Sequence, residues 1–351
     1  MNVILPRMDM KQALGKLTTG AGLSREEARS VMETIMSGEA SPSQIAGVAT
    51  ALRMKGETKD EITGFAEAMR AYSSQLHTNR EGLLDTCGTG GSGIHKFNIS
   101  TSSAIIAAAA GIRVAKHGNR AMSGKTGSAD VLEALGVDIT LTPGQAAECL
   151  ERTGICFMFA QLYHPSLKHA AVPRKELGIR TIFNILGPLA NPAGADRQLL
   201  GLYDRSKTEL IAHVLGELGL ARALVVGSHD GLDEISISEP TRVSELNGGQ
   251  VRTYDLTPEE LGLKRYPLSE VIGGGPAENA TIIRGIFRGE ERGAYREIVV
   301  ANAAACIYVG GAAESLKEGA AIAAEMIDSG AAERKLEQLI RTTGELAHVS
   351  G

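Results

Sequence analysis

A run of glycines between residues 88 and 93 is the first feature of this chain that could perform chemistry. The sequence reads Asp85-Thr86-Cys87-Gly88-Thr89-Gly90-Gly91-Ser92-Gly93, and Asn98-Ile99-Ser100-Thr101 follows, opening an alanine-rich helix. Glycines let the backbone adopt positive φ and approach an anion closely, and the first N–H groups of a helix have no partner within it. The arrangement predicts a phosphate-binding loop, with a flexible turn as the alternative. It matches neither the P-loop of NTPases nor the Rossmann fingerprint.

A second polar cluster follows the next predicted strand. It reads Lys116-His117-Gly118-Asn119-Arg120-Ala121-Met122-Ser123-Gly124-Lys125-Thr126-Gly127-Ser128, with three cations, three hydroxyls and three glycines in thirteen residues. Lysine supplies charge, while glycine amides and hydroxyls supply directed hydrogen bonds, so the segment is a candidate for binding an anion. The alternative is a solvated basic loop. Its position at the carboxyl end of a strand favours binding.

The third element is the adjacent pair Asp233 and Glu234, which follows the predicted strand 223–226 and the turn His229-Asp230-Gly231. Mg²⁺ prefers oxygen ligands and is usually held by one or two carboxylates together with substrate phosphates. Beside two phosphate loops, the pair is therefore a candidate for Mg²⁺, and Ser100 is a candidate hydroxyl ligand. On its own the pair would be interpreted as a surface turn.

The elements that position these residues differ along the chain. The first quarter predicts short helices, each opened by a capping box and each with one apolar face that must pack on another part of the chain. The boxes are Ser24 with Glu27, Ser41 with Gln44, and Thr58 with Glu61. We therefore predict a helical domain over residues 1–78, completed by helices from about 164–190.

From about residue 80, short apolar runs alternate with helices, which predicts a mainly parallel sheet flanked by helices. The fold class is thus α/β, with a small N-terminal helical domain and a large α/β domain over residues 79–351. The expected strands are 83–86, 112–115, 155–160, 198–203 and 222–226, with a hairpin turn at 247–249. The expected helices are 101–110, 128–135, 143–153, 207–218 (opened by a capping box of Ser206 with Glu209), 277–288, 294–308, 315–328 and 331–342.

Composition bounds the class of protein. The chain has 351 residues, 43% of them hydrophobic, and a net charge of −5 without a basic track, which argues against nucleic acid as a partner. Four scattered cysteines lack metal-ligand spacing and predict reduced thiols. No signal peptide or membrane span is expected, so we predict a cytoplasmic protein that does not bind membranes.

The ordered motifs resemble those of the anthranilate phosphoribosyltransferases over nearly the whole chain. They are Gly88-Thr89-Gly90-Gly91, Asn98-Ile99-Ser100-Thr101, Lys116-His117-Gly118-Asn119-Arg120, Gly127-Ser128-Ala129-Asp130, Tyr163-His164-Pro165, Gly178-Ile179-Arg180-Thr181, Asn184-Ile185-Leu186-Gly187-Pro188 and Gly231-Leu232-Asp233-Glu234. The resemblance implies transfer of the phosphoribosyl group of phosphoribosyl pyrophosphate (PRPP) to the amine of anthranilate, a step of tryptophan biosynthesis. It also implies the fold of pyrimidine nucleoside phosphorylases, Mg²⁺ as cofactor with two ions, and a homodimer.

The resemblance also implies roles for individual residues. The positions implied to bind PRPP are Gly88, Gly91, Ser92, Lys96, Asn98, Ile99, Ser100, Thr101, Lys116, His117, Gly118, Asn119, Arg120, Ala121, Met122, Ser123, Gly124 and Ser128. Those implied to contact anthranilate are Gly88, Asn119 and Arg174, and the metal ligands are Ser100, Asp233 and Glu234. A guanidinium suits a carboxylate because it can donate two parallel hydrogen bonds, although Arg174 alone would be interpreted as a helix-surface residue. No general base is evident; His117 could fill that role or be structural.

Two positions depart from the family's pattern. The glycine loop usually ends in Asp where this chain has Ser92, and Thr is common where this chain has Lys96. The departures remove one negative charge and add one positive charge beside the expected diphosphate and metals. The rival enzyme class is a pyrimidine nucleoside phosphorylase, and Arg174 with the carboxylate pair favours PRPP. A non-catalytic nucleic-acid-binding relative is the other alternative, which the acidic composition disfavours.

Overall fold

The computed structural model describes residues 8–121 and 125–348. The chain divides into two units. Unit 1 comprises Met1–Ser74 and His164–Ala190, and unit 2 comprises Gln75–Tyr163 and Asn191–Gly351.

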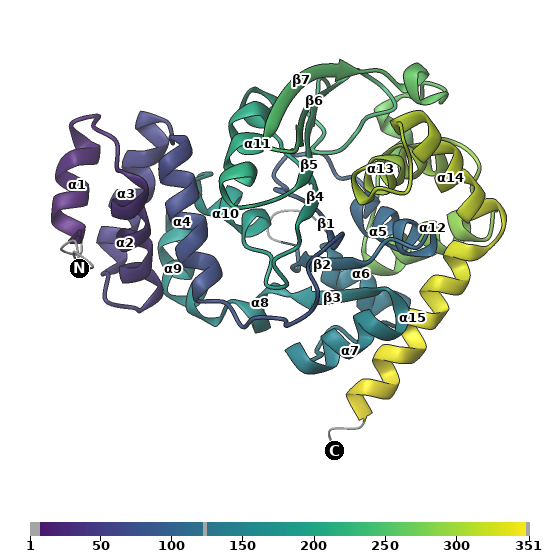
Figure 1. The fold of residues 1–351 in the computed structure, drawn as a ribbon, viewed down its shortest axis with the longest axis horizontal. Coiled ribbons are helices and arrows are strands. Elements are labelled where there is room, and N and C mark those ends of the chain that lie inside the picture. The colour runs from purple at the N-terminus through teal and green to yellow at the C-terminus, as the bar shows by residue number, and fades with distance from the viewer. Residues whose placement is uncertain (1–7, 122–124, 349–351) are drawn as a thin grey trace. The chain divides into compact units, whose positions relative to one another are not determined.

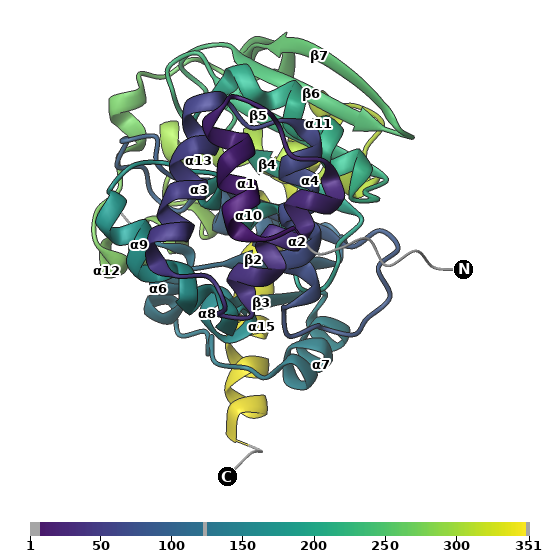
Figure 2. The same cartoon turned by 90° about the vertical axis from the view of Figure 1, so that its left-hand side faces the viewer.

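Unit 1 is a group of helices. The three capping boxes expected from the sequence are present, and Pro42 occupies the first turn of its helix. Helix α2 packs on α4, α1 on α3, and α3 on α9, as Figure 2 lets the reader follow. The contact of α2 with α4 is close at Gly64, where an added Cβ would lie 2.2 Å from the carbonyl oxygen of Arg25. The helices are α1 (Met10–Thr18), α2 (Arg25–Met36), α3 (Pro42–Lys55), α4 (Lys59–Ala71), α9 (Lys168–Leu177) and α10 (Phe183–Leu189), with the 3₁₀ turn η1 (Pro165–Leu167).

Unit 2 is built on a seven-stranded sheet with the order β3-β2-β1-β4-β5-β6-β7. The pairs among β1 to β5 are parallel, and β6 and β7 add an antiparallel hairpin. The parallel strands are mostly buried, as expected where helices cover both faces, and they bury polar side chains such as Asp85, Lys116 and Gln198 along with apolar ones. The strands are β1 (Leu84–Gly88), β2 (Val114–Gly118), β3 (Ile155–Phe159), β4 (Arg197–Gly201), β5 (Arg222–Ser228), β6 (Thr241–Asn247) and β7 (Gln250–Leu256).

Helices α5, α13 and α14 lie on one side of the sheet and α11 on the other (Figure 1). Small residues bring the first group close together: a Cβ on Gly319 of α14 would lie 2.5 Å from the carbonyl oxygen of Ala304 in α13. The helices of unit 2 are α5 (Ile99–Ala109), α6 (Ser128–Leu135), α7 (Pro143–Thr153), α8 (Ala160–Tyr163), α11 (Thr208–Glu217), α12 (Pro276–Phe287), α13 (Ala294–Gly310), α14 (Leu316–Asp328) and α15 (Ala331–His348), with the 3₁₀ turns η2 (Arg205–Lys207), η3 (Pro258–Leu261) and η4 (Leu268–Val271).

The five strands, the hairpin and the helices of unit 2 expected from the sequence are confirmed, with ends that shift by a few residues. The capping box of Ser206 with Glu209 is wrong. Ser206 lies in the turn η2, where Asp204 accepts hydrogen bonds from its N–H at 3.1 Å and its hydroxyl at 2.6 Å, and α11 begins at Thr208 without a side-chain cap. The carboxylate of Asp204 competes for the hydroxyl that the box needed.

Two further findings concern the chain as a whole. All four cysteines are free thiols, and three of them are buried. Within residues 8–121 and 125–348, no helix is long and apolar enough to cross a membrane.

Candidate functional site

Three loops of unit 2 meet at one edge of the sheet because each follows a parallel strand. The glycine loop (residues 88–97) follows β1, the second loop (residues 119–127) follows β2, and the carboxylate pair (Asp233 and Glu234) follows β5. The carboxyl ends of parallel strands are where ligands bind in open α/β sheets. The structure thus places all three predicted elements in the position that the fold favours for a site.

The glycine loop turns through three residues with positive φ. Gly90, Gly91 and Gly93 have φ of 66°, 80° and 78°, a conformation that glycine adopts without cost. At Gly88, an added Cβ would lie 2.8 Å from Oδ2 of Asp233, so the absence of a side chain lets the carboxylate approach the strand. Gly90 then donates its N–H to the same oxygen at 3.0 Å.

The start of helix α5 presents unfilled backbone donors toward this edge. Asn98 is the N-cap residue but makes no side-chain cap; its amide donates to the carbonyl of Thr126 at 3.4 Å, and its Oδ1 accepts from Asn279 at 3.0 Å. The side chain of Asn98 therefore ties the second loop and α12 to the glycine loop. Ile99 donates its N–H to the carbonyl of Phe97 at 2.9 Å, whereas the N–H groups of Ser100 and Thr101 have no backbone partner among the described residues and are available to an anion.

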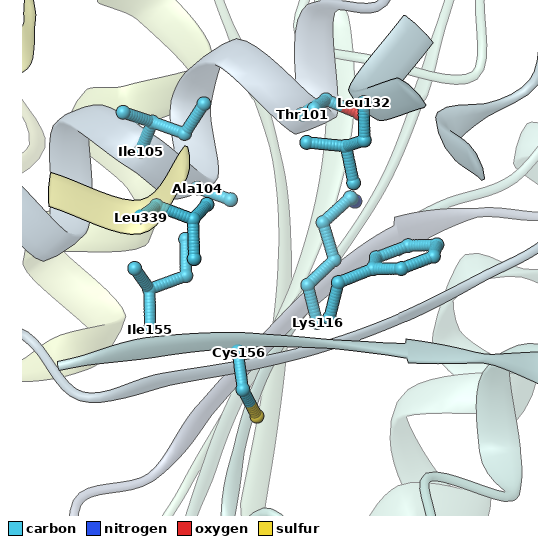
Figure 3. Close-up of a pocket in the computed structure, with 9 residues that line it drawn as sticks. Thr101, Ala104, Ile105, Lys116, Leu132, Ile155, Cys156 and Leu339 are labelled. Carbon is cyan, nitrogen blue, oxygen red and sulfur yellow. The ribbon is translucent and has the colours of Figure 1, made fainter. Parts of the chain in front are cut away.

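The lysine of the second motif is buried rather than exposed to a ligand. Lys116 lies on β2 with a relative exposure of 3%, and its ammonium donates to the carbonyl of Thr86 at 2.5 Å and to Oγ of Ser100 at 3.2 Å. It holds the hydroxyl of Ser100, a predicted ligand, in place. Figure 3 shows Lys116 extending toward Thr101 and Leu132 beside a cavity of about 10 Å³ that is lined mainly by apolar side chains and is too small for a substrate.

One carboxylate of α6 binds the described residues on either side of positions 122–124 in the second loop. Oδ2 of Asp130 accepts the N–H groups of Ala121 at 2.9 Å and Gly127 at 2.8 Å, one at each end of the segment. Arg120 pairs with Asp130 and Glu133 and lies 5.3 Å from the ring of Phe159, so this cation is exposed but already paired within the protein.

Other predicted PRPP-binding positions in and beside this loop contact neighbouring residues of unit 2. Asn119 accepts the hydroxyl of Ser128 at its carbonyl, and Gly118 gives that hydroxyl room, because an added Cβ would lie 2.2 Å from it. His117 is buried and donates its N–H to Asp85 at 3.1 Å. Met122, Ser123 and Gly124, also predicted to bind PRPP, lie outside the described residues.

Lys96 makes the contact that the sequence reasoning missed. Its ammonium donates to Oδ1 of Asp233 at 2.7 Å and to Oε1 of Glu234 at 2.8 Å. Sequence alone suggested that this lysine contacts phosphate. The signal that could have revealed the pairing is the joint departure at Ser92 and Lys96, because a charge added beside two carboxylates binds them when no substrate is present.

Burial and the ion pairs act in opposition on these charges. Burial favours the neutral form of Lys96, but the attraction of both carboxylates outweighs it, so the pKa of Lys96 lies above its ordinary value. Burial also opposes ionisation of Asp233, and its contacts with Lys96 hold its pKa below the usual value. Burial raises the pKa of Glu234, because the attraction of Lys96 does not offset burial and the repulsion of Asp233.

The carboxylate pair fits a bound cation. Two buried carboxylate oxygens converge on one point, and the ammonium of Lys96 already stands there as a cation. Oxygen donors of this kind suit Mg²⁺. Within the described part of the chain no third His, Cys, Asp or Glu joins them, so an ion at this point would take its remaining ligands from hydroxyl, water or substrate.

The predicted anthranilate residues lie in different units. Gly88 and Asn119 belong to unit 2, and Arg174 belongs to helix α9 of unit 1. Burial lowers the pKa of Arg174, and its guanidinium lies 5.7 Å from the ring of Phe183. Among residues 8–121 and 125–348 no carboxylate pairs with it. A partly buried guanidinium without a counter-ion is suited to receive the carboxylate of a ligand.

Two family models and a curated protein match this chain over most of its length. The model of the glycosyl transferase family a/b domain matches residues 80–333, and that of the family's helical bundle domain matches residues 11–73. The anthranilate phosphoribosyltransferase of Brevibacillus brevis is 51% identical over 338 residues, which cover 96% of this chain and 99% of the relative.

Solved structures agree. That of anthranilate phosphoribosyltransferase from Thermus thermophilus has a TM-score of 0.90 and 46% identity, covering 94% of this chain and 99% of the other. That of the Saccharomyces cerevisiae enzyme in complex with PRPP and Mg has a TM-score of 0.87 and 27% identity, covering 96% and 98%.

Proposed function

This chain belongs to the anthranilate phosphoribosyltransferases, and from that premise we propose which of its residues carry the reaction. The enzyme transfers the phosphoribosyl group of PRPP to the amine of anthranilate, in tryptophan biosynthesis, with Mg²⁺. The products are N-(5-phosphoribosyl)anthranilate and diphosphate. The bond that breaks joins C1 of the ribose to the diphosphate oxygen, and the bond that forms joins C1 to the amine nitrogen.

The protein's task is to stabilise a departing diphosphate and to position a weak aromatic amine. As the C1–O bond lengthens, positive charge develops on the ribose and negative charge on the diphosphate. Donors fixed in advance around the leaving group lower that barrier without reorganising during the reaction. No covalent nucleophile is needed, and we assign none.

We assign the PRPP site to the glycine loop, the first turn of α5 and the second loop. Support comes from the positive-φ glycines and from the helix N–H groups left without a side-chain cap at Asn98. Lys116 is assigned a positioning role, because its ammonium holds Ser100 and is itself buried. His117 is assigned a structural role, because its backbone bonds to Asp85 and its ring is buried.

Mg²⁺ is assigned to Ser100, Asp233 and Glu234, together with the diphosphate of the substrate. When bound, the ion neutralises charge that develops on the diphosphate. The chain's own contribution is to hold two buried carboxylates at the edge of the sheet, where Gly88 and Gly201 leave room for Asp233 and Gly90 donates to it. The family resemblance implies two Mg²⁺ ions at this site.

Arg174 is assigned to the carboxylate of anthranilate, with Gly88 and Asn119 as further contacts. The observation in support is a partly buried guanidinium that lacks a carboxylate partner within the described residues. We also propose a homodimer and a cytoplasmic location, both of which rest on the resemblance and on the sequence.

The observation that carries the function is similarity to anthranilate phosphoribosyltransferases over 96% of the chain. The test is to incubate the purified chain with PRPP, Mg²⁺ and anthranilate and to follow the fluorescence of anthranilate. We expect the fluorescence to fall as product forms, and omission of PRPP is the control. Persistent fluorescence with folded protein would contradict the function.

A further inference from the structure

The ammonium of Lys96 occupies the point on which the two metal-ligand carboxylates converge. Its distances to Oδ1 of Asp233 and Oε1 of Glu234 differ by only 0.1 Å, at 2.7 and 2.8 Å. A third, longer contact of 3.4 Å reaches the backbone carbonyl of Asp233. The ammonium is therefore shared between both carboxylates and not paired with one of them.

The backbone of Lys96 is anchored, so this contact is not that of a mobile surface lysine. Lys96 forms an isolated antiparallel bridge with Ile272, and Gly273 donates its N–H to the carbonyl of His95 at 2.7 Å. Gly273 can lie there only without a side chain, because an added Cβ would be 2.5 Å from the backbone nitrogen of Phe97.

The residue after Lys96 fixes the same segment from the other side. The ring of Phe97 is buried and meets the ring of Tyr295 edge to face, with centroids 5.1 Å apart. The hydroxyl of Tyr295 donates to the carbonyl of Ile272 at 2.7 Å, which closes the bridge. These contacts aim the Lys96 side chain at the carboxylate pair and leave it only 17% exposed.

The charge of the cluster follows from its members. Two carboxylates and one ammonium give a net charge of −1, and Ser92, which hydrogen-bonds to Asp233, adds none. A chain with Asp and Thr at positions 92 and 96 would carry −3 in the same place. The difference of two positive charges equals the charge of one Mg²⁺ ion.

We infer that Lys96 is a built-in replacement for one of two divalent cations, so that this enzyme works with one Mg²⁺ and one ammonium at its carboxylate pair. This inference rests on the proposed metal ligands. The remaining Mg²⁺ arrives with the diphosphate of PRPP, and the pair has little affinity for a free ion, because an incoming ion must first displace an ammonium held by two carboxylates. The serine at position 92 belongs to the same arrangement, because a third carboxylate would again demand a divalent ion.

The test counts Mn²⁺, a paramagnetic substitute for Mg²⁺, bound to the full chain by electron paramagnetic resonance. Without PRPP, we expect the wild type to bind Mn²⁺ at least roughly tenfold more weakly than Lys96→Thr, and more weakly still than the double variant Ser92→Asp with Lys96→Thr. With PRPP equimolar to the chain and no anthranilate, we expect one bound ion in the wild type and two in the double variant.

Two control variants test whether an additional Mn²⁺ ion binds at the carboxylate pair. Lys264→Thr removes an exposed lysine and should leave Mn²⁺ binding as in the wild type. Adding Asp233→Asn to Lys96→Thr should abolish the gain, because the gained ion needs that carboxylate. Two ions in the wild type with PRPP, or equal affinity in the wild type and Lys96→Thr, would overturn the inference. The wild-type count decides the matter even if a variant does not fold.

Metal counting and turnover can fail independently. Turnover of PRPP and anthranilate with two bound Mn²⁺ in the wild type would leave the function standing and remove the role of Lys96. A gain of Mn²⁺ in Lys96→Thr without turnover in the wild type would support the role of Lys96 and contradict the proposed function.

Discussion

Unit 2 holds two buried clusters of lysine and carboxylate that use their charges differently. In the loop cluster (Lys96, Asp233 and Glu234) the ammonium touches both carboxylates. In the strand cluster (Asp85, Lys116 and Gln198) the ammonium donates to a carbonyl and a hydroxyl, and Asp85 accepts from the N–H of His117 at 3.1 Å and from Gln198 at 3.2 Å.

The contrast appears in the two aspartates. Burial is the largest influence on both. Neutral donors and the more distant charge of Lys116 do not offset it at Asp85, whose pKa is raised. Direct contact with Lys96 does offset it at Asp233, whose pKa is lowered. Direct contact with a cation thus keeps Asp233 readily ionised, whereas the pKa of Glu234, touched by the same ammonium, is raised by burial and by the repulsion of Asp233. Only in the loop arrangement does a cation touch the carboxylates directly, so that another cation could replace it.

The largest effect is expected from removing the negative charge of the loop cluster. Asp233→Asn with Glu234→Gln should lower turnover by more than about 100-fold at ordinary Mg²⁺, because neutral amides are poor ligands for a hard cation and the developing charge loses its stabilisation. Steady-state kinetics across a Mg²⁺ titration measures the loss.

The control for that double variant adds Lys96→Met, which removes the buried ammonium that would otherwise lose both partners. Circular dichroism of both variants checks the fold. A double variant that is folded and turns over at nearly the wild-type rate would show that the pair does not serve the metal.

The two lysines should respond differently to metal. Lys96→Met leaves two buried carboxylates without a cation and should lower the free energy of unfolding by about 3 kcal/mol. Excess Mg²⁺ should restore much of that loss, because the ion can replace the ammonium. Lys116→Met should cost about 2 kcal/mol through its lost hydrogen bonds, and Mg²⁺ should restore much less of it than in Lys96→Met, since neither lost partner is a carboxylate.

Urea unfolding with and without Mg²⁺ measures both variants against the wild type. Equal recovery of the two variants would erase the distinction between the clusters. So would a Lys96→Met variant that is destabilised but indifferent to Mg²⁺.

Arg174 of unit 1 is a third case: a partly buried charge without a carboxylate partner in the described residues. If substrate supplies that carboxylate, Arg174→Ala should weaken kcat/KM for anthranilate by roughly 1.5–3 kcal/mol and change PRPP binding much less. Arg174→Lys is the matched control, which keeps the charge but loses the parallel pair of hydrogen bonds and should recover only part of the loss. Equal losses toward both substrates would indicate a structural role.

Much of this could be predicted from the sequence, because the relevant signals are local. Capping boxes, alternating apolar runs and glycine spacing predicted helices α2, α3 and α4, the five parallel strands and the three loops at the sheet edge, while α1, with its capping box of Asp9 and Gln12, was not predicted. The joint departure at positions 92 and 96 was a signal that Lys96 makes a new charge contact, but local spacing could not identify its partners, since Asp233 and Glu234 lie more than 130 residues away and meet Lys96 only through the order of the strands.

Local spacing was also insufficient to predict the surroundings of Lys116 and Ser206. Lys116 was predicted to bind PRPP, and its burial could not be foreseen from its motif, because β2 lies inside the sheet and α5 covers it. Ser206 had the spacing of a capping residue, and the neighbouring Asp204 took its hydroxyl instead. Spacing predicts which groups are close along the chain and does not decide between competing partners.

The smallest effect on the free energy of unfolding is expected for Asp85→Asn. Its dependence on pH tests the contrast between Asp85 and Asp233. Asp85→Asn should change the free energy of unfolding at neutral pH by no more than about 1–2 kcal/mol, because the asparagine oxygen still accepts the N–H of His117 and the amide of Gln198 can turn to accept from the new NH₂. Replacing the carboxylate also removes a buried charge, which works in the opposite direction.

The sign with pH follows from linkage. The folded pKa of Asp85 is raised above 3.8, so between 3.8 and the folded value the native state binds more protons than the unfolded state, and the wild type loses stability as pH rises. Asp85→Asn lacks that loss, so its stability relative to the wild type should rise with pH across this window and then level off. Asp233, with its lowered pKa, contributes stability present above 3.8 and lost as pH falls through its folded pKa. Urea unfolding of wild type and Asp85→Asn from mildly acid to neutral pH measures the difference, and a relative stability that falls with rising pH would mean that Asp85 is held as Asp233 is, by a cation in direct contact.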